Sequence, residues 1–211
     1  MKTKIYNLII LDASGSMQSI KAQTITGFNE TVQTIKDAQR KHENQEHLIS
    51  LVVFNSSKID TVYDRVAASD VKELNDDTYI PDCSTPLYDA MGQGLNALRS
   101  NVGKDDRVLV TIITDGYENA STEYSGTAIK SLVDELKSKG WVFTYIGANQ
   151  DVEKVAATIS IHNVVNFAAT GVGTSAMFSK ERKSRTRFFD RLAESDNQVD
   201  ECMNEDYFKE D

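Results

Sequence analysis

The 211-residue chain has few of the residues that cross-link a protein or bind zinc. It has only two cysteines, Cys83 and Cys202, which excludes a framework of disulfides. Its three histidines, His42, His47 and His162, lack the spacing of a zinc site, and we expect them at the surface or at helix caps. No hydrophobic run approaches the roughly 20 residues of a membrane helix. We also find no apolar segment of the export type, and therefore predict a cytoplasmic protein with no membrane contact.

Positive charge is also scarce. The formal net charge is −9, and nine acidic residues face two basic ones in the last part of the chain, residues 189–211. An acidic chain without a broad basic face is a poor candidate for binding nucleic acid. The one basic run, residues 180–187, is expected to be a solvated helix face or a partner for the acidic segment. We predict one domain over residues 1–188, followed by a loosely held acidic tail over residues 189–211.

What the sequence does contain is an alternation of apolar strands and amphipathic helices. The patterns predict strands near residues 8–11, 47–54, 107–114, 141–146 and 164–167, and helices near 25–40, 87–102, 124–139, 151–159 and from 174 onward. Residues 58–66 alternate more loosely and predict an antiparallel edge strand. The fold class is therefore α/β: a doubly wound, Rossmann-like, mostly parallel sheet with one antiparallel edge strand and helices on both faces.

Polar oxygen-bearing side chains stand at the ends of these elements. Asp12, Ser14 and Ser16 follow the first strand, Thr85 precedes a helix, and Asp115 follows the strand at 107–114. If those two strands are neighbours at the switch point of the sheet, the three segments meet at one edge. Two carboxylates and three hydroxyls are hard ligands, which favours Mg²⁺ and disfavours zinc or copper.

These segments resemble the metal-ion-dependent adhesion site of von Willebrand factor A domains. The motifs are Asp-Ala-Ser-Gly-Ser at 12–16, Ser-Thr-Pro-Leu-Tyr-Asp-Ala at 84–90 and Thr-Asp-Gly at 114–116, and the similarity extends over about residues 4–167. The resemblance implies that Asp12, Ser14, Ser16, Thr85 and Asp115 hold Mg²⁺ or Mn²⁺, directly or through water.

The resemblance, which is to intracellular bacterial members of the family, also implies a function. An Asp or Glu of a partner protein would complete the coordination of the metal, which makes the chain a metal-dependent interaction module. Members of this type often work with ATPases, kinases or phosphatases, which are therefore candidate partners. Polar residues on the rim of the metal face would select the partner, and we expect this rim to contain Gln18, Asn55, Ser56, Tyr117, Glu118, Asn119 and Asn149.

Two other functions stay open. An aspartate after the first strand of such a sheet can be a phosphoryl-transfer nucleophile, so Asp12 could serve a metal-dependent phosphatase or hydrolase. Phosphatases of the haloacid dehalogenase type need a second acid two residues later, where this chain has Ser14, and no glycine-rich phosphate loop with lysine is present. A scaffold without an ion is the third possibility, because Cys83-Ser84 stands where many bacterial relatives have glycine-rich sequence. We predict binding rather than catalysis.

Overall fold

The computed structural model describes residues 2–148, 151–195 and 206–209. Within these residues, six strands form one sheet in the order β3-β2-β1-β4-β5-β6, in which only the β2–β3 pair is antiparallel. The strands are β1 (Thr3–Asp12), β2 (Gln45–Asn55), β3 (Lys58–Ala67), β4 (Arg107–Thr114), β5 (Val142–Ala148) and β6 (Asn163–Phe167). This arrangement confirms the predicted fold class.

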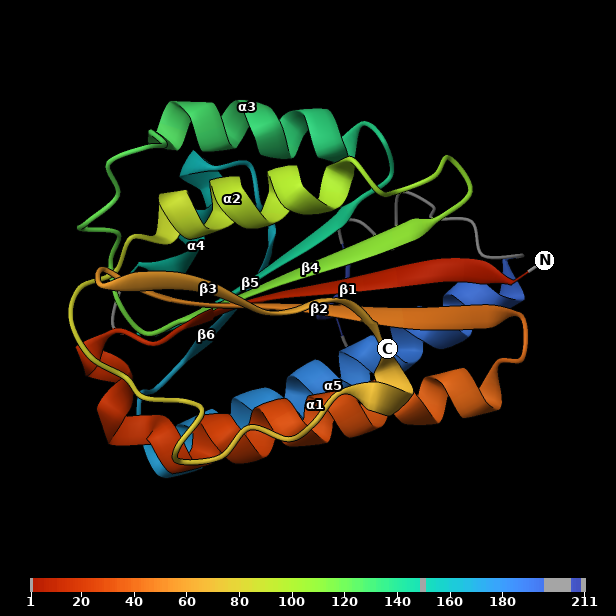
Figure 1. The fold of residues 1–211 in the computed structure, drawn as a ribbon, viewed down its shortest axis with the longest axis horizontal. Coiled ribbons are helices and arrows are strands. Elements are labelled where there is room, and N and C mark those ends of the chain that lie inside the picture. The colour runs from red at the N-terminus through yellow and green to blue at the C-terminus, as the bar shows by residue number, and fades with distance from the viewer. Residues whose placement is uncertain (1, 149–150, 196–205, 210–211) are drawn as a thin grey trace.

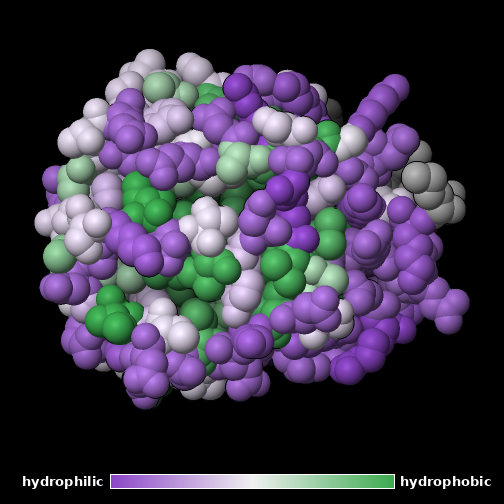
Figure 2. Space-filling view, viewed as in Figure 1, coloured by the Kyte–Doolittle hydropathy of each residue, from purple (hydrophilic) through white to green (hydrophobic). Residues whose placement is uncertain are grey.

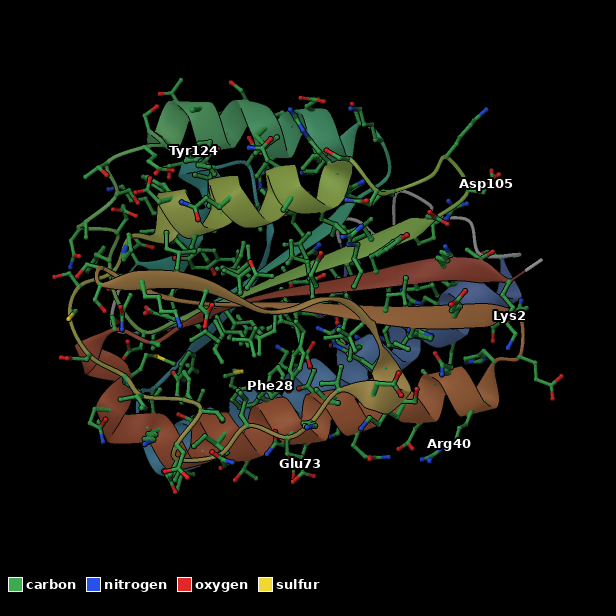
Figure 3. The ribbon with its side chains drawn as sticks, viewed as in Figure 1. Lys2, Phe28, Arg40, Glu73, Asp105 and Tyr124 are labelled. Carbon is green, nitrogen blue, oxygen red and sulfur yellow. The ribbon has the colours of Figure 1, made fainter. Side chains whose placement is uncertain are left out.

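Helices cover both faces of the sheet (Figure 1). One layer consists of α1 (Lys21–Lys41) and α5 (Gly171–Glu194), and the other of α2 (Leu87–Arg99), α3 (Gly126–Lys137) and α4 (Val152–Thr158). Apolar stripes explain this placement: Phe28, for example, points from α1 toward the sheet and is 1% exposed (Figure 3). In the part of the chain that the structure describes, no helix is both long and apolar enough to cross a membrane.

The two glycines of α2 allow close packing. A Cβ at Gly94 would lie 3.3 Å from a methyl group of Val52, so this helix lies tightly on the sheet. A Cβ at Gly92 would instead lie 2.5 Å from the ring of Tyr124, in the segment before α3. Each glycine allows close packing against a different neighbour, and this packing offsets the low helix propensity of glycine.

The antiparallel strand β3 forms one edge of the sheet. Its pairing with β2 shifts register between Ile49 and Val52, and Arg65 adopts a positive φ of 52°. Figure 2 shows hydrophobic residues among polar ones on the face that carries β3. Irregular pairing and charged residues are common features of edge strands, because they discourage pairing with another chain.

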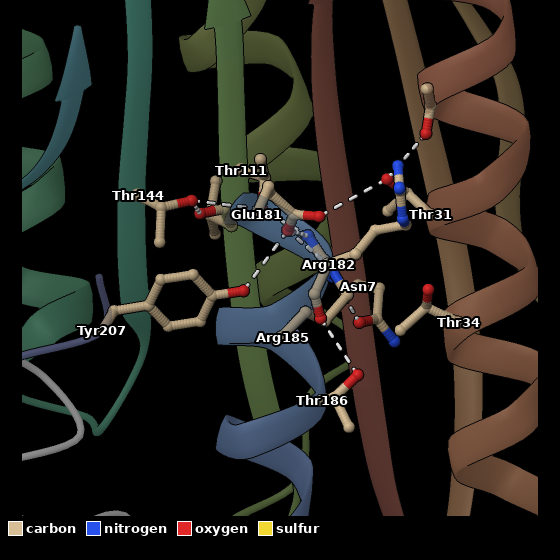
Figure 4. A network of polar contacts seen from close by, with 12 residues as sticks. Asn7, Thr31, Thr34, Thr111, Thr144, Glu181, Arg182, Arg185, Thr186 and Tyr207 are labelled. Atoms are coloured by element: carbon tan, nitrogen blue, oxygen red, sulfur yellow. Dashed lines mark hydrogen bonds and ion pairs between the residues drawn. The ribbon is translucent and has the colours of Figure 1, made fainter. Parts of the chain in front are cut away.

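One part of the basic run at residues 180–187 differs from the predicted solvated face, whereas Lys183 is exposed and Arg187 donates to the Tyr207 carbonyl of the predicted tail at 3.2 Å. Arg185 is fully buried under α5, where its guanidinium donates to Glu181, Asn7 and Thr111 at 2.7, 2.9 and 2.7 Å (Figure 4). Glu181 is 1% exposed and also accepts a bond from Tyr207 at 3.3 Å. This part of the run is an internal ion pair with hydrogen-bonded neighbours, rather than a solvated face.

Two further expectations change near α5. His47, expected at the surface or at a cap, is fully buried with its ring against Phe189 at 4.5 Å between centroids. The helix α5 continues through the proposed boundary at residue 188 to Glu194, and Tyr207 and Phe208 are buried against the domain. The described residues of the predicted tail therefore include well-packed side chains, while residues 196–205 and 210–211 lie outside the described part.

Candidate metal site

The two strands that end at the predicted ligands are neighbours. The parallel strands β1 and β4 pair from Ile5 with Arg107 to Leu11 with Ile113. Chain connections run in opposite directions from these strands, so their carboxyl ends form the switch point of the sheet. The register places Asp12 and Asp115 at the same edge, where β1 passes into the short 3₁₀ helix η1 (Gly15–Ile20).

A chain of hydrogen bonds joins the predicted ligands of the first segment, residues 12–16, to Asp115. The Ser14 amide donates to Asp12 Oδ1 at 2.7 Å, and the hydroxyls of Ser14 and Ser16 lie 3.2 Å apart. Ser16 Oγ then donates to Asp115 Oδ1 at 2.5 Å, across 99 positions of sequence. Four of the five predicted ligands thus form one continuous cluster.

Thr85 completes this cluster. A Cβ at Gly116 would lie 3.4 Å from Thr85 Oγ1 and 3.6 Å from Ser16 Oγ, so both hydroxyls face the same glycine. Asn119 fixes the Thr85 segment. Its side-chain Oδ1 accepts from the Thr85 backbone N–H at 2.8 Å, and its backbone N–H donates to the Thr85 carbonyl at 3.1 Å. The structure therefore brings all five predicted residues together.

The segment before Thr85 is held by its neighbours despite its departure from glycine-rich sequence. Cys83 adopts a positive φ of 65°, and its carbonyl accepts from the Gly15 amide at 2.9 Å. Ser84 exchanges bonds with Ser56, accepting from its amide at 2.9 Å and donating its own amide to Ser56 Oγ at 3.0 Å. These bonds set the position of Thr85 from both sides.

Both carboxylates are buried, and burial changes their acidity. Asp12 is fully buried, which raises its pKa from 3.8 to about 6 although Thr114 and Ser14 bond to the charged form. Asp115 is 2% exposed, and burial raises its pKa as well. Asp12 makes no ion pair with any residue that the structure describes. The ionised site is therefore rich in negative charge and is stabilised mainly by neutral donors.

The donor set fits a hard divalent cation. In the described part of the chain, no three His, Cys, Asp or Glu side chains gather in a way that could hold a metal ion. A cation here would consequently rely on hydroxyl oxygens beside the carboxylates of Asp12 and Asp115. Such an all-oxygen set suits Mg²⁺ or Mn²⁺ and is unsuitable for metals that prefer sulfur or imidazole.

Two supporting residues were missed by sequence reasoning. Thr114 Oγ1 donates to Asp12 Oδ2 at 2.6 Å, and Tyr79 donates its hydroxyl to the Asp12 carbonyl at 2.6 Å. Thr114 could have been found, because it ends the strand beside β1 in the predicted sheet. Tyr79 lies in a segment with no apolar period, and nothing in the pattern placed it against Asp12.

The predicted rim residues differ in how freely they can reach a partner. Tyr117 is 53% exposed, and Gln18 and Ser56 are exposed as well. Glu118 is half-buried and fixed in position, because its carboxylate accepts from Tyr88 N of α2 and from Ala120 N, Ser121 N and Ser121 Oγ of its own loop. Asn55 and Asn119 similarly hold turns next to the site. Asn149 lies outside the described residues, and the partner contacts of the whole set stay a prediction.

A model of the von Willebrand factor type A domain matches residues 8–181, which include all five clustered side chains. The chain belongs to this family. Its members are protein-interaction modules and are generally not enzymes. No curated protein matches the chain.

Solved structures share the fold at low sequence identity. The chain resembles proximal thread matrix protein 1 from the mussel byssus, with a TM-score of 0.59 and 16% identity over 88% of this chain and 47% of that one. It resembles the PilB minor pilin from Streptococcus sanguinis, with a TM-score of 0.57 and 14% identity over 89% and 62% of the two chains. The vWF domain of the pilus tip protein Mfa5 from Porphyromonas gingivalis gives a TM-score of 0.56 and 9% identity over 93% and 96%. The chain thus spans about half of the mussel protein and less than two thirds of the pilin.

Proposed function

We propose that the chain is a metal-dependent protein-interaction module that binds an acidic side chain of a partner. The observation that carries this proposal is the buried Asp12 carboxylate, which is surrounded by neutral donors and lies in a cluster with three hydroxyls. Asp12, Ser14, Ser16, Thr85 and Asp115 would hold Mg²⁺ or Mn²⁺, which would supply the positive charge that attracts the partner's carboxylate.

Access to the cluster supports binding of a partner. Ser16 and Gly15 are exposed, so the cluster opens to solvent on the side of η1. Interaction is also the usual activity of the family, and the pilus proteins with this fold agree with protein partners. An ATPase, kinase or phosphatase as partner, and a cytoplasmic location, remain parts of the proposal that rest on the sequence resemblance.

The decisive experiment measures metal binding directly. Titration of the chelator-treated protein with Mn²⁺ or Mg²⁺, followed by calorimetry and by the Mn²⁺ electron paramagnetic resonance signal, should show one site. Asp12→Ala should abolish the binding because the buried carboxylate is a ligand. Asp77→Asn, which removes an exposed acid outside the cluster, should bind the ion like the parent protein.

Partner binding is tested after metal binding. A pull-down from native lysate with the parent protein should lose its specific partners when EDTA is added, and Asp12→Ala should lose the same partners. A folded protein that binds no ion at millimolar concentration would contradict the proposal and favour a scaffold. Metal-dependent hydrolysis that disappears in Asp12→Asn would favour an enzyme instead.

A further inference from the structure

A groove lies beside the candidate metal site, between the segment that follows Asp115 and α4. Its volume is about 560 Å³. On one side it is lined by Tyr88, Tyr117 and Glu118, and on the other by Asp151, Lys154 and Val155. The groove has no part in holding the five clustered oxygen ligands, so it is available for another task.

The groove is close enough to the metal site to serve the same partner. Tyr117 follows Asp115 by two residues, so their Cα atoms are at most about 7.6 Å apart. A peptide in extended conformation advances about 3.3 Å per residue. A partner residue one to three positions from the acid lies at most about 10 Å from it, which matches the separation between Asp115 and the residue that lines the groove.

The walls of the groove combine apolar surface with negative charge. The rings of Tyr88 and Tyr117 and the side chain of Val155 offer apolar contact, and Tyr117 is 53% exposed. The lining contains two acidic residues, Glu118 and Asp151, and one basic residue, Lys154, so its formal charge is negative. The four hydrogen bonds to Glu118 hold its carboxylate in place. Such walls match a long side chain with an aliphatic stem and a cationic end.

The charge of the whole molecule favours the same kind of occupant. With a formal net charge of −9, the chain repels a strongly acidic segment at a distance. A basic residue next to the acid reduces this repulsion while leaving the acid free to reach the metal. We propose that the groove binds a lysine or arginine side chain of the partner, one to three residues away from the acid that completes the metal site. This inference rests on the proposed metal-dependent function.

The experiment selects binders from a phage-displayed library of random dodecapeptides against the full chain in Mg²⁺, with elution by EDTA. We expect the enriched peptides to carry Asp or Glu with Lys or Arg at a constant spacing of one to three residues. In synthetic copies, replacing the basic residue by norleucine should weaken binding. Tyr117→Leu keeps apolar contact but removes the aromatic face, and should weaken the basic peptides roughly 2- to 30-fold.

A matched pair of charge variants separates the groove from general electrostatics. The Asp151 side chain caps α4 by accepting from the Lys154 backbone N–H, and asparagine can keep this cap. Asp151→Asn should therefore weaken the binding of basic peptides roughly two- to fivefold. Glu153→Gln removes the same charge from an exposed position of α4 outside the groove, and should have little effect.

The outcomes distinguish this inference from the function on which it rests. Acidic peptides that elute with EDTA but share no basic residue, or that share an aromatic one instead, would overturn the inference and leave the metal-dependent function in place. Equal effects of Asp151→Asn and Glu153→Gln would also overturn it. A selection that yields no EDTA-sensitive peptide would contradict both.

Discussion

Two clusters of buried polar groups in this protein differ in how their negative charge is balanced. Beneath α5, the carboxylate of Glu181 meets the guanidinium of Arg185, and both side chains are at most 1% exposed. At the ends of β1 and β4, the equally buried carboxylate of Asp12 receives bonds from the Ser14 amide and the Thr114 hydroxyl. The first cluster contains its own cation, whereas Asp12 is stabilised by neutral donors.

Acidity reflects this difference. Burial by itself would lower the pKa of Arg185, but Glu181 beside it raises that pKa, so the pair stays charged. Burial raises the pKa of Asp12 to about 6, because neutral donors offset only part of the lost hydration. The comparison teaches that similar burial can serve two purposes: the Glu181–Arg185 cluster is balanced by its own cation, whereas the Asp12 cluster would gain stability from the cation that we propose it binds.

Removing the cation from the balanced cluster should have the largest effect. Arg185→Met leaves Glu181 buried without its partner, and we expect a loss of about 3–5 kcal/mol in the free energy of unfolding. Urea denaturation followed by circular dichroism measures this loss. The double variant Glu181→Leu/Arg185→Met should be more stable than the single one, because it leaves no isolated charge.

An exposed ion pair provides the control for this effect. Lys130 and Asp134 form an i,i+4 pair on α3 at 2.7 Å, and both side chains are 48% exposed. Lys130→Met should cost less than about 1 kcal/mol, since solvent screens such pairs. Equal losses in Lys130→Met and Arg185→Met would show that the two clusters do not differ as we argue.

At the Asp12 cluster, which contains no cation of its own among the described residues, removing the charge should raise the free energy of unfolding rather than lower it. Asp12→Asn keeps an acceptor for the Ser14 amide and removes the carboxylate whose ionisation is opposed by burial. In metal-free buffer at pH 7, we expect the free energy of unfolding to rise by as much as about 3 kcal/mol. Thermal unfolding with and without Mg²⁺ checks both effects, because the variant should also lose any stabilisation by the ion.

The fold was predictable from the sequence, because each helix and strand buries one or both faces. The spacing of its apolar residues therefore shows which kind of element it is. The clustering of the five candidate ligands was predictable for a related reason: parallel neighbours end at one edge, so β1 and β4 bring Asp12 and Asp115 together. Tyr79 was not predictable, because the segment that carries it is shaped by contacts with the finished sheet.

The buried charges of α5 had a signal that we misinterpreted. Met177, Glu181, Arg185, Phe188 and Leu192 follow one another at three- and four-residue steps, and all are buried. Because Glu181 and Arg185 are charged, we interpreted them as an interruption of the apolar stripe and predicted that this part of the helix faces solvent. The spacing in the sequence can place a charged residue on the inner face of a helix. It does not show whether an oppositely charged partner, such as Glu181 for Arg185, compensates for its burial.

Histidine near the balanced cluster predicts a pH dependence. Burial, with a smaller effect of Arg185, lowers the pKa of His47 from 6.5 to about 3. Between these values the unfolded chain binds one more proton at His47 than the folded chain, so the contribution of His47 to stability is full above pH 6.5 and falls as the pH decreases. The loss due to His47 should reach about 2 kcal/mol at pH 5, measured by urea denaturation across this range.

The variant that isolates this contribution is His47→Phe, which keeps the aromatic contact with Phe189 and removes the titrating group. It should show a shallower decline of stability between pH 7 and pH 5 than the parent protein. His162→Gln, at an exposed position, should keep the original slope. Because the raised pKa of Asp12 acts in the opposite direction over the same range, the test is the difference between the two proteins. A difference in stability between the parent and His47→Phe that stays constant from pH 7 to pH 5 would contradict the assignment.

Among the buried groups, the smallest effect concerns the hydroxyl that connects Tyr207 to the balanced cluster. Tyr207 donates to Glu181 Oε1 at 3.3 Å, and its ring packs against Phe188 and Phe208 at 5.8 and 4.8 Å between centroids. Tyr207→Phe keeps the ring and removes one bond to a charged group whose main partner, Arg185, remains. We expect a loss of about 1 kcal/mol in urea denaturation. A loss as large as that of Arg185→Met would mean that the guanidinium alone does not balance Glu181, and that the hydroxyl is an essential part of the cluster.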